Sequence, residues 1–316
     1  MIKILREENP DVIHLHNIHW YYLNYPVLFK YLSEEYKGKV LWTFHDCRPF
    51  TWHCPYFTMA KCNKWKTWCY KCPNKRLYPI SLVFDNSKSN YESKKKYFTS
   101  LKNLTIITPS DWLNNLVKQS FMWKYNVVTV NNRIDRNIFK PNIDEAVLEK
   151  YNIPKNKKIV LWVANIWEER KWLNVFKEIS SKIDDNYVIV LVWLTDKQIK
   201  ELPSNVIWIK RTSNIDELVT LYSRSNVFVN PSQEETFSLV TIEAMACKTK
   251  VVVLDTSAVW ELVDEETGIV LHNQDIQNYI KAIYKLSNEK ISVEKLTKIL
   301  DKYDKDEQIM KIFNLF

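Results

Sequence analysis

Two acidic residues with a fixed spacing are the first candidates for chemistry. Glu235 and Glu243 lie eight residues apart in the segment NPSQEETFSLVTIEAMA, residues 230–246. If the segment were helical throughout, a rise of about 1.5 Å per residue would separate their backbones by about 12 Å. That exceeds the separation of about 5–9.5 Å between the paired carboxyl groups of glycosidases. We therefore do not expect the two glutamates to act together on one bond.

The same segment offers a second kind of site. A short loop enters a helix here, and the first amides of a helix point at anions. The two glutamates could hold two parts of an extended ligand, while an anion between them faces the amides of Phe237, Ser238 and Leu239. The alternative, two solvated glutamates with no shared ligand, stays open on spacing alone.

A cluster of cysteines is the second candidate. Five of the six cysteines fall within residues 47–72, and two of them form a C-x-x-C pair: Cys47, Cys54, Cys62, Cys69 and Cys72. Disulfides are disfavoured in the cytoplasm, whereas four thiolates at such spacings suit tetrahedral zinc. A structural zinc ion would take Cys54, Cys62, Cys69 and Cys72. Reduced unliganded thiols and redox chemistry remain alternatives, and Cys47 and Cys247 are expected to pack in the core.

The second half of the chain predicts the sheet that would position these groups. Apolar runs rich in valine and isoleucine alternate with helical stretches: strands near 157–163, 187–193, 205–209, 226–232 and 250–255, and helices near 173–182, 215–223 and 239–246. Strands separated by helices of this length form right-handed βαβ units and a parallel sheet. Continuous rather than alternating apolar runs indicate that both faces of the sheet are covered.

The first half repeats the pattern less regularly. Strands are expected near 11–17, 39–46, 104–110 and 127–132, with helices near 26–36 and 111–121. The architecture predicted is α/β, with two doubly wound, Rossmann-like domains facing a cleft. We place the first domain at residues 1–135 with a cysteine-rich insertion at 47–72, a linker at 136–157, and the second domain at 158–316. In such sheets ligands bind beyond the carboxyl ends of the strands.

Composition limits the class of protein. The 316 residues are 46% hydrophobic and 26% charged, with a net charge of +8. No apolar run reaches the about 18 residues that a membrane span needs, and the start lacks the apolar core of a signal peptide. We expect a cytoplasmic protein. Residues 87–103 predict a basic amphipathic helix, either a solvated face or a peripheral contact with an anionic membrane. No nucleic-acid reader motif accompanies the charge.

Two totals are unusual. The chain has 2 glycines and 13 tryptophans, where an average glycine usage of about 7% would give roughly 22 glycines. Tryptophans follow or end several predicted strands, at Trp162, Trp193, Trp208 and Trp260, where backbone normally approaches a ligand.

The motifs together resemble one family. The segment PSQEETFSLVTIEAMA after a Rossmann-like strand is similar to the hallmark of retaining GT-B glycosyltransferases of family 4. The stretches DVIHLHNIH, WTFHDCRPFT, CNKWKT, TPSDWL, VNNRIDRNIFKP and VANIWEERK resemble the branch found in capsule and exopolysaccharide gene clusters. The resemblance implies a transferase that moves a sugar from a nucleotide-diphosphate donor to a glycan or lipid-linked acceptor, with no metal required for catalysis.

The resemblance also implies roles for individual residues. Lys171 and Arg170 would neutralise the departing diphosphate, where charge develops in the transition state. Glu235 would contact the transferred sugar and Glu243 the ribose hydroxyls. His45, in TFHD, would face the sugar from the first domain. Arg170 departs from the family pattern, in which an arginine follows a strand-end glycine, because Asn165 and Ile166 occupy that region.

The family pattern also divides the tryptophans. Nine of them stand where relatives commonly have glycine: Trp20, Trp52, Trp68, Trp123, Trp162, Trp172, Trp193, Trp208 and Trp260. Indole at positions of positive φ or of close backbone approach would strain the fold and block the diphosphate, although Trp162 and Trp172 would lie in the donor site. Our hypothesis is that UGA codons, meant to be read as glycine, were translated as tryptophan at these positions. UGA at the nine positions would support it, and UGG throughout would contradict it. Arg133, Ser238 and Lys248 also replace family glycines.

Two further expectations follow from the resemblance. Family members carry about 70–90 residues before the motif NPDVIHLH, since two-domain sheets of this type run near 150 residues each, so the first domain is expected to be truncated. Filled glycine sites and this missing front favour a rival function, a catalytically inactive protein that binds a sugar nucleotide or glycan. A second rival is a zinc-organised interaction module.

Overall fold

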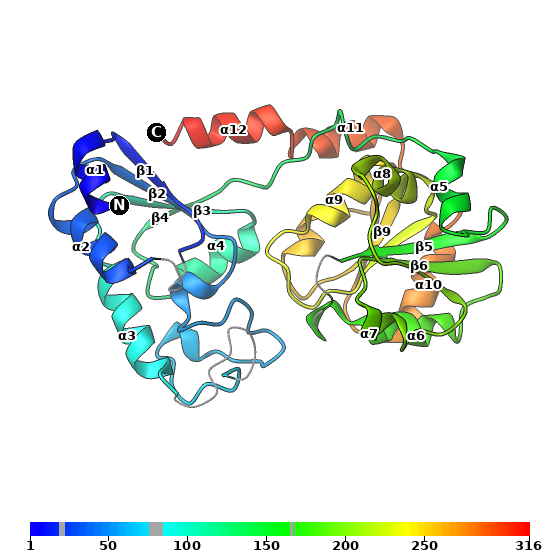
Figure 1. The fold of residues 1–316 in the computed structure, drawn as a ribbon, viewed down its shortest axis with the longest axis horizontal. Helices are drawn as coiled ribbons and strands as arrows, with labels where there is room; N and C mark the ends of the chain where they lie inside the picture. Colours follow the sequence, from blue (N-terminus) through cyan, green and yellow to red (C-terminus); the bar gives the residue numbers. More distant parts are fainter. Residues whose placement is uncertain (19–22, 76–84, 165–166, 168) are drawn as a thin grey trace. The chain divides into compact units, whose positions relative to one another are not determined.

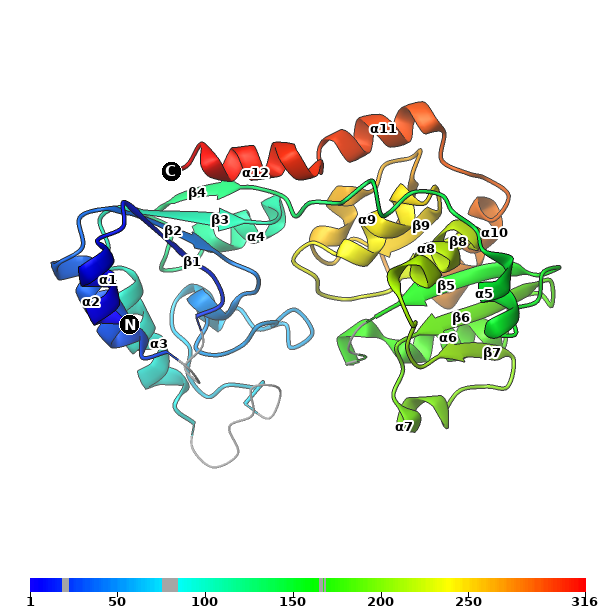
Figure 2. The same cartoon turned by 45° about the horizontal axis from the view of Figure 1, so that its top comes forward.

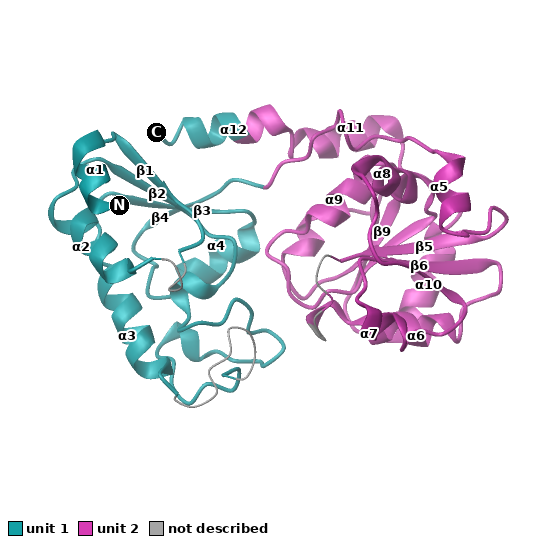
Figure 3. Ribbon diagram, viewed as in Figure 1, with its two compact units in different colours: residues 1–131, 309–316 teal, residues 132–308 magenta. Residues whose placement is uncertain are grey.

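The computed structural model describes residues 1–18, 23–75, 85–164, 167 and 169–316. The chain divides into two compact units, of which the first contains residues 1–131 and 309–316 and the second residues 132–308 (Figure 3). Trp20, Asn165 and Ile166 lie outside the described residues.

Unit 1 is a parallel α/β sheet. Its strands are β1 (Val12–Leu15), β2 (Lys39–Thr43), β3 (Leu104–Thr108) and β4 (Asn126–Thr129), in the order β1-β2-β3-β4. Its helices are α1 (Ile2–Glu8), α2 (Tyr25–Glu34), α3 (Ser87–Phe98) and α4 (Asp111–Lys118), with 3-10 turns η1 (Arg48–Phe50) and η2 (Lys64–Lys66). Each predicted strand of this half is present.

Alternation along β2 separates two apolar layers. Val40 and Trp42 point into a core with Phe29 of α2 and Phe98 of α3. Leu41 points to the opposite face, because successive side chains of a strand alternate. There it packs with Ile107, Val130 and two residues of the C-terminal segment, Ile312 and Leu315.

Unit 2 contains a six-stranded parallel sheet. Its strands are β5 (Lys158–Val163), β6 (Tyr187–Val192), β7 (Val206–Ile209), β8 (Val227–Asn230), β9 (Lys250–Leu254) and β10 (Gly268–Leu271), in the order β10-β9-β8-β5-β6-β7. Its helices include α5 (Glu145–Lys150), α6 (Leu173–Ser180), α7 (Asp196–Ile199), α8 (Ile215–Arg224), α9 (Leu239–Ala246), α10 (Ile276–Leu286) and α11 (Val293–Asp301), with turns η3 (Glu169–Lys171) and η4 (Ala258–Leu262).

Helices cover both faces of this second sheet. Figures 1 and 2 show α8 and α9 on one face and α6 and α10 on the other. The middle strands are consequently buried, and every residue of β8 and β9 is inaccessible to solvent or nearly so. The apolar runs of the sequence therefore predicted the covered sheet correctly.

The division of the chain differs from the predicted one. The boundary between the two units falls between Asn131 and Asn132 in the sequence. Residues 136–157, expected as a linker, belong to unit 2 and include α5. Helix α12 (Lys305–Phe313) begins in unit 2, and residues 309–316 belong to unit 1. The reason is local packing, since Ile312 and Leu315 cover Leu41 and Ile107 of the first sheet.

The basic helix predicted at 87–103 is α3, which ends at Phe98. Its lysines are not all directed to solvent, because Lys94 donates to the carbonyl oxygens of Arg48 (2.8 Å) and Thr51 (3.2 Å). Among the described residues, none of the helices combines the length and apolar character needed to span a bilayer.

Several residues other than glycine occupy the left-handed region of backbone conformation. Trp172 (φ 51°), Trp193 (φ 66°), Ser238 (φ 92°) and Lys248 (φ 64°) are among them, and all four are positions at which the resemblance implies glycine. A left-handed conformation costs a residue with a Cβ roughly 1–2 kcal/mol. In contrast, Gly268 has no positive φ, but a Cβ there would lie 2.0 Å from the carbonyl oxygen of Val251.

Candidate functional site

The order of strands in unit 2 locates the crevice in which a ligand is expected. From β5 the chain runs outward through β6 to β7, and then returns to β8, which pairs with the other side of β5. Neighbouring strands whose connections leave in opposite directions form the topological switch point of a parallel sheet. Ligands of open α/β sheets bind there, outside the carboxyl ends of the strands.

Charged side chains meet at this switch point. Lys171 follows β5, Glu235 follows β8, and the Lys171 ammonium and the Glu235 carboxylate form an ion pair. Arg170 Nη1 lies 3.8 Å from Glu235 Oε2 and donates to the carbonyl oxygen of Glu234 at 3.0 Å. The structure thus brings three of the four predicted catalytic residues together.

The ion pair is largely shielded from water. Side-chain exposure is 10% for Lys171 and 13% for Glu235. Burial alone would raise the pKa of Glu235, but the charges of Lys171 and then Arg170 outweigh it and hold that pKa below its usual value. Glu235 is therefore a carboxylate at neutral pH, between two cations that could also meet a phosphate.

Glu243 occupies a different environment on α9. Its Oε2 accepts a hydrogen bond of 2.8 Å from the Tyr222 hydroxyl of α8. Burial raises the pKa of Glu243 to about 7, and the hydrogen bond from Tyr222 opposes that rise only in part. The two glutamates thus have opposite pKa shifts, which indicates separate roles rather than a shared one.

The loop between β8 and α9 is not helical, so the condition under which the glutamates lie about 12 Å apart is not met. Helix α9 begins at Leu239, with Ser238 as its left-handed N-cap. Ser238 Oγ accepts from Asn230 Nδ2 at 3.0 Å, and Asn230 Nδ2 also reaches Thr241 Oγ1 at 2.9 Å. Asn230 therefore ties the end of β8 to the first turn of α9. Phe237 is buried, whereas Leu239 is exposed.

The two tryptophans predicted in the donor site contact this cluster unequally. Trp162 is fully buried in β5, and the Lys171 ammonium lies 5.5 Å from the centre of its ring. The indole Nε1 of Trp162 is buried and has no hydrogen-bond partner among the described residues. Trp172 is the left-handed N-cap of α6, and its ring packs edge-on against Tyr279 at 6.1 Å. The Trp162 indole thus lies against the Lys171 ammonium. Trp172 is the next residue in sequence, and its ring lies against Tyr279.

His45 lies in unit 1 among other histidines. Its Nε2 is 3.0 Å from His16 Nδ1, and the two rings stack with centroids 5.4 Å apart. Burial, followed by the charge of His16, lowers the pKa of His45. A hollow at the carboxyl end of β2 is lined by both histidines, Asp46 and Arg48. Because His45 belongs to the other unit, its predicted action on the sugar stays a prediction.

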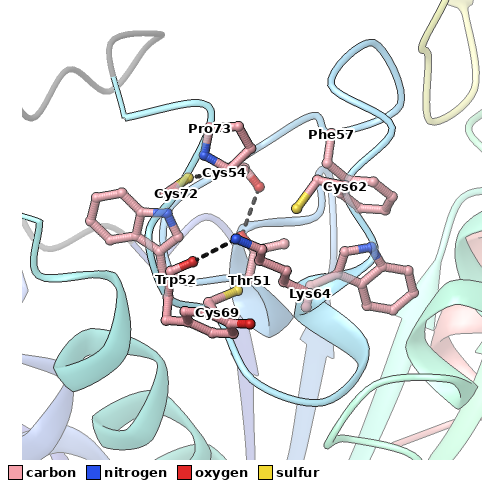
Figure 4. Close-up of a pocket in the computed structure, with 11 residues that line it drawn as sticks. Thr51, Trp52, Cys54, Phe57, Cys62, Lys64, Cys69, Cys72 and Pro73 are labelled. Carbon is pink, nitrogen blue, oxygen red and sulfur yellow. Dashed lines mark hydrogen bonds between the residues drawn. The ribbon is translucent and has the colours of Figure 1, made fainter.

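The cysteines proposed as zinc ligands surround one small hollow in unit 1. Cys54, Cys62, Cys69 and Cys72 all line it (Figure 4). The ligand atoms that lie within 4.8 Å of one another come from His53, Cys54 and Cys72. Cys47 and Cys247 are buried in the two cores, as expected.

Sequence reasoning missed four partners of these sites: His53, Tyr222, Asn230 and His16. A signal existed for His16, because HLHN and TFHD both follow predicted parallel strands, whose carboxyl ends share one edge. Tyr222 lies in the middle of an amphipathic helix, and nothing in its spacing distinguishes it from a core tyrosine.

Comparison with known proteins is consistent with this geometry. Residues 157–289 match the family described as Glycosyl transferases group 1. Alpha-maltose-1-phosphate synthase of Mycolicibacterium smegmatis is 26% identical over an alignment of 162 residues. The alignment covers 46% of this chain and 42% of that protein. The putative colanic acid biosynthesis glycosyl transferase WcaC of Escherichia coli is 32% identical over 34% of this chain and 27% of its own length. The capsular polysaccharide biosynthesis glycosyltransferase CapM of Staphylococcus aureus is 29% identical over 58% of this chain and 52% of its own length.

Solved structures match the fold. Sucrose-phosphate synthase from Thermosynechococcus elongatus gives a TM-score of 0.73 at 18% identity, covering 99% of this chain and 74% of that one. HepE of Anabaena, solved in complex with UDP-glucose, gives a TM-score of 0.67 at 13% identity. The match covers 99% of this chain and 80% of that one. The matched segments span 42%, 27% and 52% of the three curated relatives above. Residues 157–289 of this chain are thus similar to the Glycosyl transferases group 1 family, and the two parallel α/β sheets of the chain have the fold of the GT-B glycosyltransferases.

Proposed function

We propose that the protein is a glycosyltransferase that moves a sugar from a nucleotide-diphosphate donor to a glycan or lipid-linked acceptor, with retention of configuration. The observation that carries the proposal is the buried cluster of Arg170, Lys171 and Glu235 at the switch point between β5 and β8. Both cations lie at this switch point, where ligands of open α/β sheets bind, and residues 157–289 match the family described as Glycosyl transferases group 1.

The proposed reaction breaks one bond and forms one. The bond between the sugar C1 and the diphosphate oxygen breaks, and a bond between C1 and an acceptor hydroxyl oxygen forms. The departing nucleoside diphosphate takes the electron pair of the broken bond, so negative charge develops on its oxygen, and it then accepts the hydroxyl proton. Lys171 and Arg170 stabilise that charge as it develops, because preorganised cations in a water-poor site act most strongly there. This placement leaves no step that requires a metal ion.

Glu235 and Glu243 have separate roles in this proposal. Glu235, ionised between two cations, accepts hydrogen bonds from the transferred sugar. Glu243, near the middle of α9, accepts from the ribose hydroxyls, and the amides of Phe237, Ser238 and Leu239 face the phosphates. Ribose hydroxyls are better donors to a carboxylate than to a carboxyl group, so donor binding favours the ionised form of Glu243.

The acceptor is proposed from relatives. WcaC and CapM are named for colanic acid and capsular polysaccharide biosynthesis, so we propose that this chain elongates a surface polysaccharide at the inner face of the membrane. A peripheral contact through α3 fits its lysine content. Since Lys94 is held by backbone carbonyls, the contact would rest on Lys88, Lys95 and Lys96.

The test of the transferase is donor-dependent product formation by the purified chain. UDP-glucose is the first probe, since HepE was solved with it, and GDP-mannose is the second. We expect Lys171→Ala and Glu235→Gln each to lower kcat at least 100-fold, the usual effect of removing one group that stabilises developing charge. Lys177→Ala is the matched control, because Lys177 pairs with Glu201 on the outer side of α6. Unchanged turnover in Glu235→Gln would exclude Glu235 from the mechanism.

One observation favours the rival, a protein that binds a sugar nucleotide without transferring it. The indole of Trp162 fills the space next to Lys171. Calorimetric binding of UDP-glucose with no release of UDP or glucose, in both the parent chain and Trp162→Gly, would support the rival. Turnover that appears only in the Trp162→Gly variant, or in a combined variant with Trp172→Gly, would support the transferase.

A further inference from the structure

Residues 47–75, which follow β2, contain little regular secondary structure. Within residues 47–75 the regular structure amounts to two 3-10 turns, η1 and η2. Five cysteines and one buried histidine lie in this segment. All of them belong to unit 1, whereas Arg170, Lys171 and Glu235 belong to unit 2.

The spacing of two sulfur atoms is that of metal ligands. Cys54 Sγ and Cys72 Sγ are 3.9 Å apart. A disulfide would place them at about 2.05 Å. Two thiolates on one tetrahedral zinc ion, each about 2.3 Å from the metal, are about 3.8 Å apart. The observed distance agrees with the second arrangement.

A histidine completes the same cluster. His53, Cys54 and Cys72 each offer a ligand atom, and these atoms lie within 4.8 Å of one another. His53 is 8% exposed, and within the part of the chain that the structure describes its Nε2 is buried without a hydrogen-bond partner. An unsatisfied buried nitrogen is costly, and coordination to a metal would remove that cost. A metal ion beside Cys54 and Cys72 would give this imidazole a partner that none of the described residues provides.

A fourth ligand would come from Cys69, whose Sγ is not among the atoms that lie within 4.8 Å of one another. It precedes Cys72 in a C-x-x-C pair, the spacing at which one loop gives two ligands to one zinc ion. It is buried, and it lines the same hollow as Cys54 and Cys72 (Figure 4). Cys62 lines the hollow too, but it comes from a separate turn, outside the C-x-x-C pair.

We infer that His53, Cys54, Cys69 and Cys72 bind one zinc ion that holds the segment 47–75 in place. Four protein ligands leave no open position, so the ion is structural rather than catalytic. Three thiolates, a neutral imidazole and Zn²⁺ have a net charge of minus one. Lys94 carries the compensating charge next to Cys54 and Cys69, held by its bonds to the carbonyls of Arg48 and Thr51.

The inferred ion joins the two ends of the segment. His53 and Cys54 lie at its start and Cys69 and Cys72 near its end, and η2 between them places Trp65 in the core of unit 1. Tyr91 of α3 donates to the Trp65 carbonyl oxygen at 2.9 Å. Loss of the ion is thus expected to loosen η2 and its contact with α3, while unit 2 is unaffected.

The test begins with the full chain, purified without an affinity tag under reducing conditions. Mass spectrometry of the metals is expected to find one zinc per chain, and Co²⁺ exchanged into the site is expected to show the visible bands of tetrahedral cobalt with thiolate ligands. A chain that contains no zinc, and that takes up neither added Zn²⁺ nor Co²⁺, would overturn the inference.

Variants identify the ligands. We expect Cys69→Ser and His53→Gln to lose zinc by at least ten-fold in occupancy, whereas the matched controls Cys62→Ser and Cys47→Ser keep it. Retention by His53→Gln together with loss by Cys62→Ser would overturn the ligand set. If a variant fails to fold, the parent chain still decides: chelation of its zinc should increase hydrogen exchange in residues 47–75 and leave β5 and β8 unchanged. Equal exchange before and after chelation would contradict the structural role.

Discussion

At the scale of single residues, Glu243 shows how burial sets a charge state before any ligand is bound. Its pKa is raised to about 7 by burial. An acid whose pKa is higher in the folded protein binds its proton more tightly there, so its contribution to stability is complete below the unfolded pKa and is lost as pH rises through the folded one. The window here runs from about 4.5 to about 7.

We therefore expect Glu243→Gln to remove a pH dependence. The parent chain should lose about 2–3 kcal/mol of unfolding free energy from unit 2 between pH 5 and pH 8, at about 1.4 kcal/mol per pKa unit. Glu243→Gln should lose much less, and should be the more stable of the two at pH 8. Urea unfolding at the two pH values measures this. An identical pH dependence in parent and variant would show that Glu243 is ionised in the folded protein.

The left-handed tryptophans allow a test of backbone strain that is separate from packing. At Trp193, with φ of 66°, replacement by glycine or alanine loses the same indole. Only glycine accepts the backbone without strain. We expect Trp193→Gly to be about 1 kcal/mol more stable than Trp193→Ala, measured by urea unfolding. Trp208, exposed in β7, is the control, and there alanine should be the more stable because glycine weakens a strand. The same order at both sites would contradict the strain.

At the scale of elements, the ends of β1 and β2 bring histidines from distant parts of the chain together. The parallel register pairs His14 with Leu41, so the residues that follow the two strands meet at one edge. His14 Nε2 lies 2.8 Å from Thr43 Oγ1, and the His14 and His16 rings are 4.3 Å apart. Burial, and then the charges of His16 and His45, lower the pKa of His14 to about 4.

This cluster should destabilise unit 1 in mild acid. A histidine whose pKa is lower in the folded protein opposes protonation, so stability is lost as pH falls from the unfolded value of 6.5 toward about 4. We expect a loss of about 1–3 kcal/mol across this window, and His14→Gln should reduce it. His272→Asn, at an exposed histidine of unit 2, should not. Unfolding of unit 1, followed at pH 7 and pH 5, distinguishes the two.

The elements also show what the sequence could and could not predict. Strands β5, β6 and β9 are long Val/Ile runs, and their apolar continuity predicted a sheet covered on both faces. Strand β10 was not predicted from the sequence, although β7 and β8, which also have four residues, were. The ion pair of Lys171 with Glu235 required the strand order, which depends on which side of β5 receives β8, and no local pattern contains that choice.

At the scale of the whole molecule, the C-terminal residues 309–316 belong to unit 1, although the residues that precede them, 132–308, form unit 2. Residues 309–316 follow α11 of unit 2, yet they cluster with unit 1. Leu315 and Ile312 cover Leu41, Ile107 and Val130 on the face of the first sheet opposite α2 and α3. Lys39 Nζ also binds the Leu315 carbonyl oxygen at 2.9 Å.

The stability of unit 1 should therefore depend on these last residues. Leu315→Ala removes part of a half-buried leucine and should destabilise unit 1 by about 1–2 kcal/mol, less than the 2–5 kcal/mol of a fully buried one. Phe313→Ala is the matched control, because Phe313 is 55% exposed. Hydrogen exchange in Leu315→Ala should rise in β2 and β3 and stay unchanged in β5 and β8, since the leucine packs only on the first sheet. If exchange rose equally in both sheets, or in neither, residues 309–316 would not be part of the first unit's cooperative core.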